Sequence, residues 1–289
     1  MAKGTKELRQ RIRGVTNIQQ ITRAMEMVAS TKLKRMQQRA DNSRPYALRL
    51  QELVMRMAKL VGPTGIRIFE KRPVVKRVAL LVVTSDKGLC GIYNTNVIRE
   101  VSAFVDRHRG PEYHLHVLGV KGRTLLKKLK LPMAAKYPDF MEKISSRRVR
   151  EIVEELVKQY LSGHYDEVYL IFTRFDSAMV QRATVTKVLP IDPDEFRGEI
   201  AESPGDVILE PSARAIFERI LPKYLEKGVY AAVLSSVASE FAMRRAAMKQ
   251  ATDAAGDIID LLRRQYNRAR QEAITKELLE IVGGAEALK

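Results

Sequence analysis

Long stretches at both ends of the chain repeat apolar residues at the spacing of an α-helix. Between Thr16 and Leu60 the only glycine or proline is Pro45, and between Val229 and Val282 the only one is Gly256. Steps of three and four residues place side chains on one stripe of a helix. In the first stretch this stripe comprises Leu8, Ile12, Val15, Ile18, Ile21, Met25 and Val28. The pattern predicts a long N-terminal helix that Pro45 kinks or ends.

The second stretch has the seven-residue repeat of a coiled coil. Its expected core comprises Phe241, Met248, Ala255, Leu262 and Ala269, with Val237, Ala251 and Ile258 between them, although Arg244 and Gln265 interrupt the second row. An unbroken helix over residues 223–282 would span roughly 90 Å. Because both helices join the middle of the chain at their inner ends, their pairing must be antiparallel. The alternative is two separate surface helices that fold back on a core.

The middle of the chain alternates strand and helix patterns. Apolar runs predict strands at Arg77–Val83, Tyr113–Gly119 and Asp166–Phe175, and helical patterns lie between them at 95–108, 120–129 and 147–161. This alternation is typical of an α/β layer fold. The segment VQRATVTKVLPI alternates apolar and polar residues and predicts an antiparallel edge strand. Residues 192–211, rich in proline, are expected to form a loop.

These patterns divide the 289-residue chain into three parts. We expect an N-terminal coiled-coil helix over 1–60, an α/β base domain over 61–210 and a C-terminal coiled-coil helix over 211–289. The expected fold class is therefore α/β, with a long antiparallel coiled coil of the two terminal helices standing on the central domain.

Charge, cysteine content and apolar runs limit the classes of protein to which the chain can belong. The net charge is +17, and residues 1–59 hold 14 Lys and Arg against four Asp and Glu, which favours an acidic partner. The single Cys90 excludes an internal disulfide and a thiolate zinc site. The start MAKGTKELRQ has no apolar signal core, and the longest aliphatic run, Val78–Val83, is far shorter than the roughly 20 residues of a membrane span.

No group of residues predicts catalysis. The loop TSDKGLCG follows a strand and precedes a helix, where α/β sheets bind phosphate, but it matches neither GxGxxG nor GxxxxGK[ST]. Gly88 and Gly91 are explained as well by a tight turn. His114 and His116 share a strand face without a third ligand nearby, and Cys90 has no basic partner. The chain is expected to be no enzyme by itself, with no cofactor and no metal.

Two interpretations of the basic helices remain at this point. A basic helix can follow nucleic-acid phosphates, but the chain has no recognition-helix pattern and no aromatic stacking motif. A scaffolding or mechanical coiled coil among acidic protein surfaces explains the same charge. The alternative function is therefore a basic coiled-coil nucleic-acid-binding protein.

Three segments of the chain together carry a family resemblance. They are NIQQITRAMEMVASTKLKR at Asn17–Arg35, SDKGLCGIYN at Ser85–Asn94 and the sequence from Ala251 to Leu288. In this order they resemble the gamma subunit of F-type ATP synthase. The resemblance implies the central stalk rotor, an antiparallel coiled coil over a Rossmann-like base. It implies coupling of proton translocation through the membrane ring to ATP synthesis or hydrolysis.

The resemblance also implies partners and a location. One copy would turn inside three alpha and three beta subunits and meet the epsilon subunit and the c-subunit ring, without nucleic acid. Membrane association would come only through the complex, as a peripheral protein. Without a transit peptide, the expected location is the cytoplasmic face of a bacterial cell membrane.

Positions that match the family's motifs carry its expected contacts. Met25, with Arg23 and Lys32 nearby, matches the shaft methionine beside a beta subunit, for which plain coiled-coil packing is the alternative. The positions that match the region bound to a beta-subunit loop are Arg270, Gln271, Thr275 and Glu277. The residues from Ile281 and Val282 to Leu288 match the tip that turns in an apolar sleeve. Val207, Leu209 and Glu210 match the base that faces the c ring.

Overall fold

A computed structural model describes residues 3–62, 65–141, 144–192, 210 and 212–286. The chain divides into two compact units, one of residues 1–30 with 244–289 and one of residues 31–243. We call the first the helix-pair unit and the second the sheet unit. Two helices, α1 (Lys3–Val61) and α5 (Ala213–Glu286), contribute to both units.

The sheet unit is built on five strands. They are β1 (Arg77–Val83), β2 (Glu112–Leu118), β3 (Met133–Tyr137), β4 (Glu167–Phe175) and β5 (Gln181–Leu189). The order across the sheet is β3-β2-β1-β4-β5. The first four strands are parallel, and β5 runs antiparallel to β4 at one edge. With helices on both faces, this is the strand order of a Rossmann-like, doubly wound sheet.

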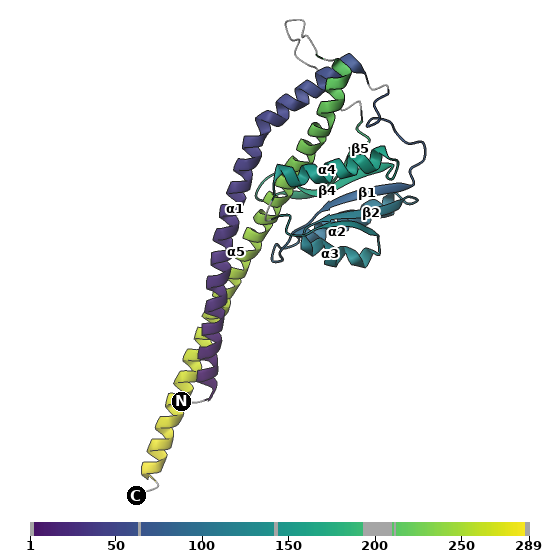
Figure 1. Cartoon of the computed structure of the whole chain (residues 1–289). Helices are drawn as coiled ribbons and strands as arrows, with labels where there is room; N and C mark the ends of the chain where they lie inside the picture. The colour runs from purple at the N-terminus through teal and green to yellow at the C-terminus, as the bar shows by residue number, and fades with distance from the viewer. Residues whose placement is uncertain (1–2, 63–64, 142–143, 193–209, 211, 287–289) are drawn as a thin grey trace. The chain divides into compact units, whose positions relative to one another are not determined.

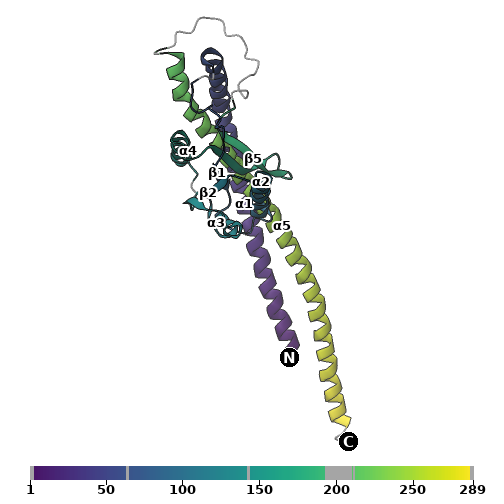
Figure 2. The same cartoon turned by 90° about the vertical axis from the view of Figure 1, so that its right-hand side faces the viewer.

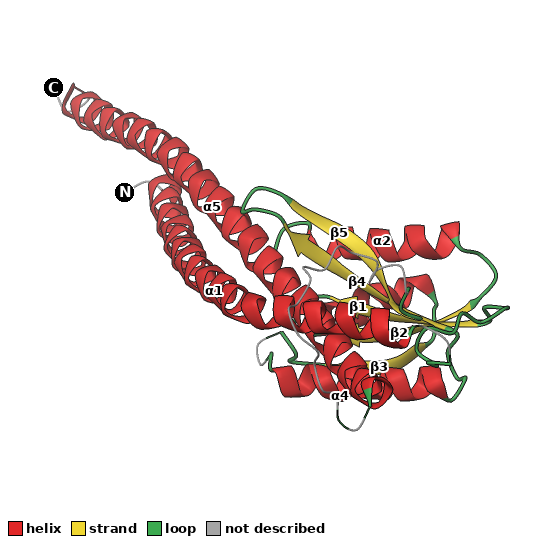
Figure 3. Ribbon diagram, turned by 90° about the horizontal axis from the view of Figure 1, so that it is seen from above, coloured by secondary structure: helices red, strands yellow, loops and turns green. Residues whose placement is uncertain are grey.

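Helices cover both faces of the sheet. These are α2 (Tyr93–Arg107), α3 (Val120–Leu126), the short 3-10 helix η1 (Lys127–Leu129) and α4 (Ser146–Leu161). Figure 1 and Figure 2 show α2 and α3 on one face and α4 on the other. The view from above in Figure 3 shows the same layers around the strands.

Successive residues of β1 point into two different cores. Val78, Leu80 and Val82 pack against α2 and β2. Ala79, Leu81 and Val83 pack against α4, the last turns of α1 and the first half of α5. Because a strand that is buried on both faces needs apolar residues at every position, the run RVALLVV has no alternation. The sheet therefore holds the sheet-unit parts of α1 and α5 on the face opposite to α2.

The predicted strands and helices of the middle are confirmed, with one addition. Strands β1, β2 and β4 and the antiparallel edge strand β5 lie where the sequence pattern places them. The sequence did not predict β3, since this five-residue strand alternates half-buried and exposed residues and contains two alanines.

The prolines do not end the long helices. Pro45 lies inside α1 and Pro222 inside α5. Of the two expected effects of Pro45, a kink or an end of the first helix, the end is wrong, because the helix continues to Val61. A proline removes one backbone hydrogen bond, and the buried Leu50, Val54 and Met57 of the following turns hold the helix to the core.

Within the described ranges, no helix is both long and apolar enough to cross a bilayer. The predicted loop over 192–211 falls almost wholly outside those ranges.

Candidate functional site

The helix-pair unit is an antiparallel pair formed by the start of α1 and the second half of α5. Figure 1 and Figure 2 show the N-terminus and the C-terminus at the same end of this pair. The predicted antiparallel coiled coil is therefore present. On α5 the seam includes the predicted Met248, Ala255 and Leu262, all buried.

Along part of both helices, the residues buried in the seam are not the predicted ones. Ile258 is exposed and its neighbour Ile259 is buried instead. On α1, Leu8, Ile12, Val15 and Met25 are half-buried as expected. Ile18, Ile21 and Val28 are exposed, however, and the seam passes through Gln19, Thr22 and Ala29. The prediction of these four seam residues was wrong because apolar residues occupy two faces of each helix.

A polar contact lies in the middle of this seam. The Thr252 hydroxyl of α5 lies 2.8 Å from the Thr22 hydroxyl of α1. The Gln19 side-chain amide donates to the Thr252 carbonyl oxygen at 3.4 Å. A Cβ at Gly256 would lie 3.1 Å from the same amide nitrogen, so the glycine gives this side chain room. Polar residues at a core position fix the register of a coiled coil.

Outward-facing apolar side chains continue along both helices of the pair. Besides Ile18, Ile21 and Val28, they comprise Met27 on α1 and Ile258, Leu261, Ile274, Leu278, Leu279, Ile281 and Val282 on α5. We call this set the outward apolar set. Large exposed apolar sets are typical of surfaces that contact other proteins.

The predicted contact residues lie on the surfaces of the long helices. Arg23 and Lys32 are exposed on α1, whereas Met25 is half-buried. Lys32 belongs to the sheet unit, where its Nζ lies 5.4 Å from the ring centroid of Phe241. On α5, the predicted residues Arg270, Gln271, Thr275 and Glu277 are all exposed.

The remaining predicted positions are described only in part. Ile281 and Val282 are exposed on the last turns of α5. Glu210 is exposed, and Val207, Leu209 and Leu288 lie outside the described residues.

The loop from Thr84 to Ile92 leaves the carboxyl end of β1, next to β4, where the strand order reverses. Such switch points are common ligand sites in α/β sheets. Here Asn94 accepts from the Ser85 amide at 3.1 Å and donates to the Ser85 hydroxyl at 2.7 Å. The Asp86 carboxylate accepts the backbone N–H groups of Val120 and Met141 at 3.1 and 2.8 Å. These polar groups thus fix the loop to the first turns of α2 and α3 and to Met141.

Cys90 and the two strand histidines are also part of the packed structure. Cys90 is buried, and its Sγ accepts from Asn94 Nδ2 at 3.4 Å. His116 is 2% exposed and lies 3.1 Å from the Tyr165 hydroxyl through Nε2. Burial first, and then the neighbouring His114, lower the pKa of His116 to about 4. Among the described residues, no three His, Cys, Asp or Glu side chains are grouped as a metal site would require.

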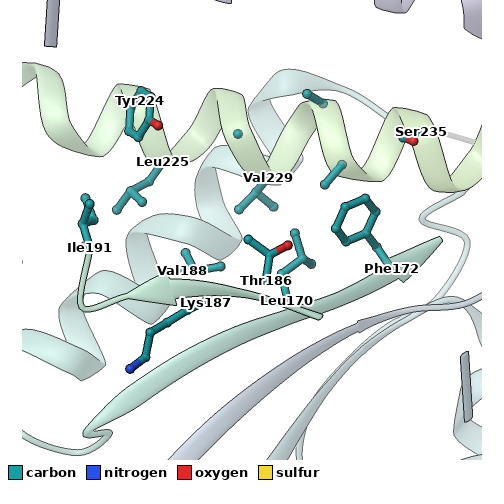
Figure 4. Close-up of a pocket in the computed structure, with 13 residues that line it drawn as sticks. Leu170, Phe172, Thr186, Lys187, Val188, Ile191, Tyr224, Leu225, Val229 and Ser235 are labelled. Atoms are coloured by element: carbon teal, nitrogen blue, oxygen red, sulfur yellow. The ribbon is translucent and has the colours of Figure 1, made fainter. Parts of the chain in front are cut away.

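A hollow of about 360 Å³ lies between α5 and the β4–β5 hairpin. Figure 4 shows Leu225 and Val229 of α5 facing Leu170 and Phe172 of β4 across it. The Ser235 hydroxyl at its margin accepts from the Phe175 amide at 2.7 Å. This lining is that of an apolar packing defect rather than a site with convergent polar groups.

Comparison with known proteins identifies the chain's relatives. The family model described as ATP synthase matches residues 4–288. The ATP synthase gamma chain of Desulfitobacterium hafniense is 42% identical, over 98% of this chain and 99% of that protein. The gamma chain of Pelotomaculum thermopropionicum is 39% identical over the same shares.

Solved structures agree with this relationship. The central stalk and c-ring structure of Tetrahymena thermophila mitochondrial ATP synthase has a chain that matches with a TM-score of 0.61 and 26% identity. That match covers 80% of this chain and 99% of the other. A rotor chain of the Euglena gracilis mitochondrial enzyme shares the fold, with a TM-score of 0.64, 17% identity and coverage of 94% and 99%. The chain belongs to the ATP synthase gamma-chain family.

Proposed function

We propose that this chain is the central rotor of an F-type ATP synthase. It couples proton translocation through the c-subunit ring to ATP synthesis or hydrolysis on three alpha and three beta subunits, and it holds no catalytic site itself. One copy per complex meets the epsilon subunit and the c ring, at the cytoplasmic face of a bacterial membrane. Family membership favours this function over nucleic-acid binding.

The observation that carries the proposal is the helix-pair unit, whose seam uses only one side of each helix. The outward apolar set and the exposed Arg270 and Gln271 leave the other sides for partner subunits. An antiparallel pair of different sequences has no threefold symmetry, so at any angle it presents a different face to each of three identical beta subunits. A rotor can bias their conformations only through such differences in contact energy.

The contact residues divide into four surfaces of the proposed rotor. Met25, Arg23 and Lys32 would face a beta-subunit lever. The region proposed to bind a beta-subunit loop comprises Arg270, Gln271, Thr275 and Glu277. The C-terminal tip of the chain, from Ile281 to Leu288, would turn in an apolar sleeve. Glu210, with Val207 and Leu209, would meet the c ring.

Reconstitution tests the proposal directly. The chain is mixed with alpha and beta subunits of a relative and the product is separated by size. We expect a stoichiometric ATP-hydrolysing complex that contains one copy of this chain. A chain that stays apart, and binds duplex DNA with a steep salt dependence instead, would contradict the proposal.

The double variant Arg270→Ala/Gln271→Ala tests the contact surface. Hydrogen bonds to charged groups contribute roughly 1.5–3 kcal/mol, and 1.4 kcal/mol is tenfold in rate, so we expect at least about a tenfold loss of ATP-driven proton pumping. The isolated chain should stay folded, because both side chains are exposed. The control Arg263→Ala/Gln265→Ala removes the same residue types from exposed positions of the same helix. Equal pumping by the test variant and the wild type would refute the assigned role.

A further inference from the structure

A buried carboxylate joins two helices of the sheet unit, α5 and α4. Glu226 of α5 is 3% exposed. Its Oε1 accepts from the Ser146 hydroxyl of α4 at 2.5 Å, and its Oε2 accepts from Arg150 Nε of α4 at 2.9 Å. Both oxygens of one α5 side chain are therefore bound by the first turns of α4.

Lys227 extends this contact to α1. Its Nζ donates to the Ser146 hydroxyl at 3.1 Å and lies 3.6 Å from Glu226 Oε1. The same Nζ lies 5.3 Å from the ring centroid of Tyr46 on α1 and 5.8 Å from that of Tyr230 on α5. The ammonium group thus touches all three helices.

Arg39 of α1 makes a second link between the same helices. Its guanidinium donates to the Tyr230 hydroxyl at 3.0 Å and to the carbonyl oxygen of Ile144, just before α4, at 3.1 Å. We call Glu226, Lys227, Ser146, Arg150, Arg39 and Tyr230 the three-helix polar cluster.

The carboxylate at its centre stays charged near neutral pH. Burial by itself would raise the pKa of Glu226, but the hydrogen bonds from Ser146 and Arg150 and the charge of Lys227 together lower it. A charged acceptor makes stronger and more directional hydrogen bonds than a neutral one.

The position of the cluster decides what it can do. Six residues of α4, among them Ile152, Leu156 and Tyr160, are buried in the core that α4 shares with the sheet. Apolar contacts have no preferred direction and permit sliding of one helix over another, whereas hydrogen bonds weaken steeply when their angles change. A sideways force between the sheet and the helices would slide α4 over α1 and α5, and the cluster opposes that motion.

We propose that Glu226 is a positioning residue for torque transfer, which with Arg150, Ser146 and Lys227 fixes α4 and the sheet to α1 and α5 so that they turn together. This inference rests on the proposed rotor function. It adds a route inside the chain by which force passes between the sheet and the long helices.

Torsional stiffness of the assembled complex tests the inference. A bead is attached through Arg109→Cys, an exposed position of the sheet unit, in a complex with alpha and beta subunits, and its angular fluctuations are recorded without ATP. Glu226→Gln keeps the shape of the side chain but removes its charge and one of the two oxygens that accept from Ser146 and Arg150, so the bonds to α4 are fewer and weaker. We therefore expect the angular variance to rise by up to about twofold.

Matched variants separate this role from general stability. Arg150→Ala should raise the variance as Glu226→Gln does, and it should fold, because the Arg150 side chain is 56% exposed. Arg150→Lys keeps the charge and should stay nearer the wild type. Glu167→Gln is the control, because it breaks an ion pair of 2.5 Å with Lys187 inside the sheet. ATP hydrolysis without load should be unchanged in all of them.

Two results would overturn the inference. One is a wild-type variance in both Glu226→Gln and Arg150→Ala, and the other is an equal rise in Glu167→Gln. Failure of the rotor function itself is a different result, since the wild-type chain would then form no ATP-hydrolysing complex and turn no bead.

Discussion

The sheet unit and the helix-pair unit use their apolar residues in opposite ways. In the sheet unit, every residue of β1 from Val78 to Val83 is buried, and the two cores fill both faces of the sheet. In the helix-pair unit, Ile259 and Leu262 are buried while their direct neighbours Ile258 and Leu261 are exposed. The first unit thus buries its apolar residues within itself, and the second keeps many of its apolar side chains exposed.

The physical reason is the number of layers. A sheet between two layers of helices buries both faces of each strand, whereas a pair of helices buries only one stripe of each. The helix pair therefore depends more on single seam residues, and on whatever covers its outer sides.

Leu81→Asp should cause the largest loss of stability, because Leu81 lies in the larger of the cores. Leu81 is fully buried on the central strand β1, so the variant places an unpaired carboxylate between the sheet and its helices. We expect a loss of about 5 kcal/mol or more in the free energy of unfolding, enough to unfold a typical domain. Urea denaturation followed by circular dichroism measures it. Leu89→Asp, at an exposed position, should change little, and similar midpoints for the two variants would contradict the described core.

Leu262→Asp should have a smaller and more local effect. The charge would lie in the seam of the helix pair, where we expect a loss of about 3 kcal/mol confined to that unit. Amide hydrogen exchange along residues 8–29 and 248–265 reports it, and so does the thermal midpoint of the assembled complex. Leu261→Asp is the matched control one residue away, at an exposed position. A larger effect of Leu261→Asp on hydrogen exchange of the isolated chain would show that the seam is assigned to the wrong residues.

Acid should weaken the sheet unit through His116, by an amount that grows gradually with falling pH. The folded chain holds the pKa of His116 at about 4, below the unfolded value of 6.5, because burial and the nearby His114 and His164 disfavour the charged ring and Glu155 only partly offsets them. The unfolded chain therefore binds more protons, and stability is lost as the pH falls from 6.5 to 4. The loss from this group is about 3 kcal/mol at most.

His116→Gln provides the control for this pH dependence. Glutamine can still bond to the Tyr165 hydroxyl but does not titrate. Denaturation midpoints between pH 7.5 and pH 4 should fall less steeply in the variant than in the wild type. Parallel slopes would contradict the prediction, because they would mean that the pKa of His116 is the same in the folded and the unfolded chain.

Sequence patterns predicted the sheet unit more accurately than the helix pair. The run at β1 is continuous and apolar because this strand is buried on both faces, and β2 and β4 hold shorter apolar runs where they are buried. The short strand β3 was missed because it has no fully buried residue and its two alanines, one exposed and one half-buried, carry little strand preference.

The seam could not be predicted from periodicity alone. Ile258 and Ile259 are equally apolar, but only Ile259 is buried. Ile259 lies seven residues after Thr252, and both belong to the helix row that also holds Met248, Ala255 and Leu262. A heptad search rejects a threonine or a glutamine in the core. Gln19, Thr22 and Thr252 hold the register here by their hydrogen bonds.

The three-helix polar cluster could not be predicted from the sequence either. Arg39, Ser146 and Glu226 lie far apart along the chain, and each by itself resembles an ordinary surface residue of a helix. Only the packing of α1, α4 and α5 brings them together.

The outward apolar set also bears on how a cell handles newly made copies of this chain. Before assembly, side chains such as Ile21, Val28 and Leu278 face water, and exposed apolar surface promotes self-association and recognition by chaperones and proteases. If partner subunits cover these side chains, as proposed, a copy made in excess of its partners would be open to removal through the same side chains. Supply of the partner subunits, rather than synthesis of this chain, would then set how much of it persists.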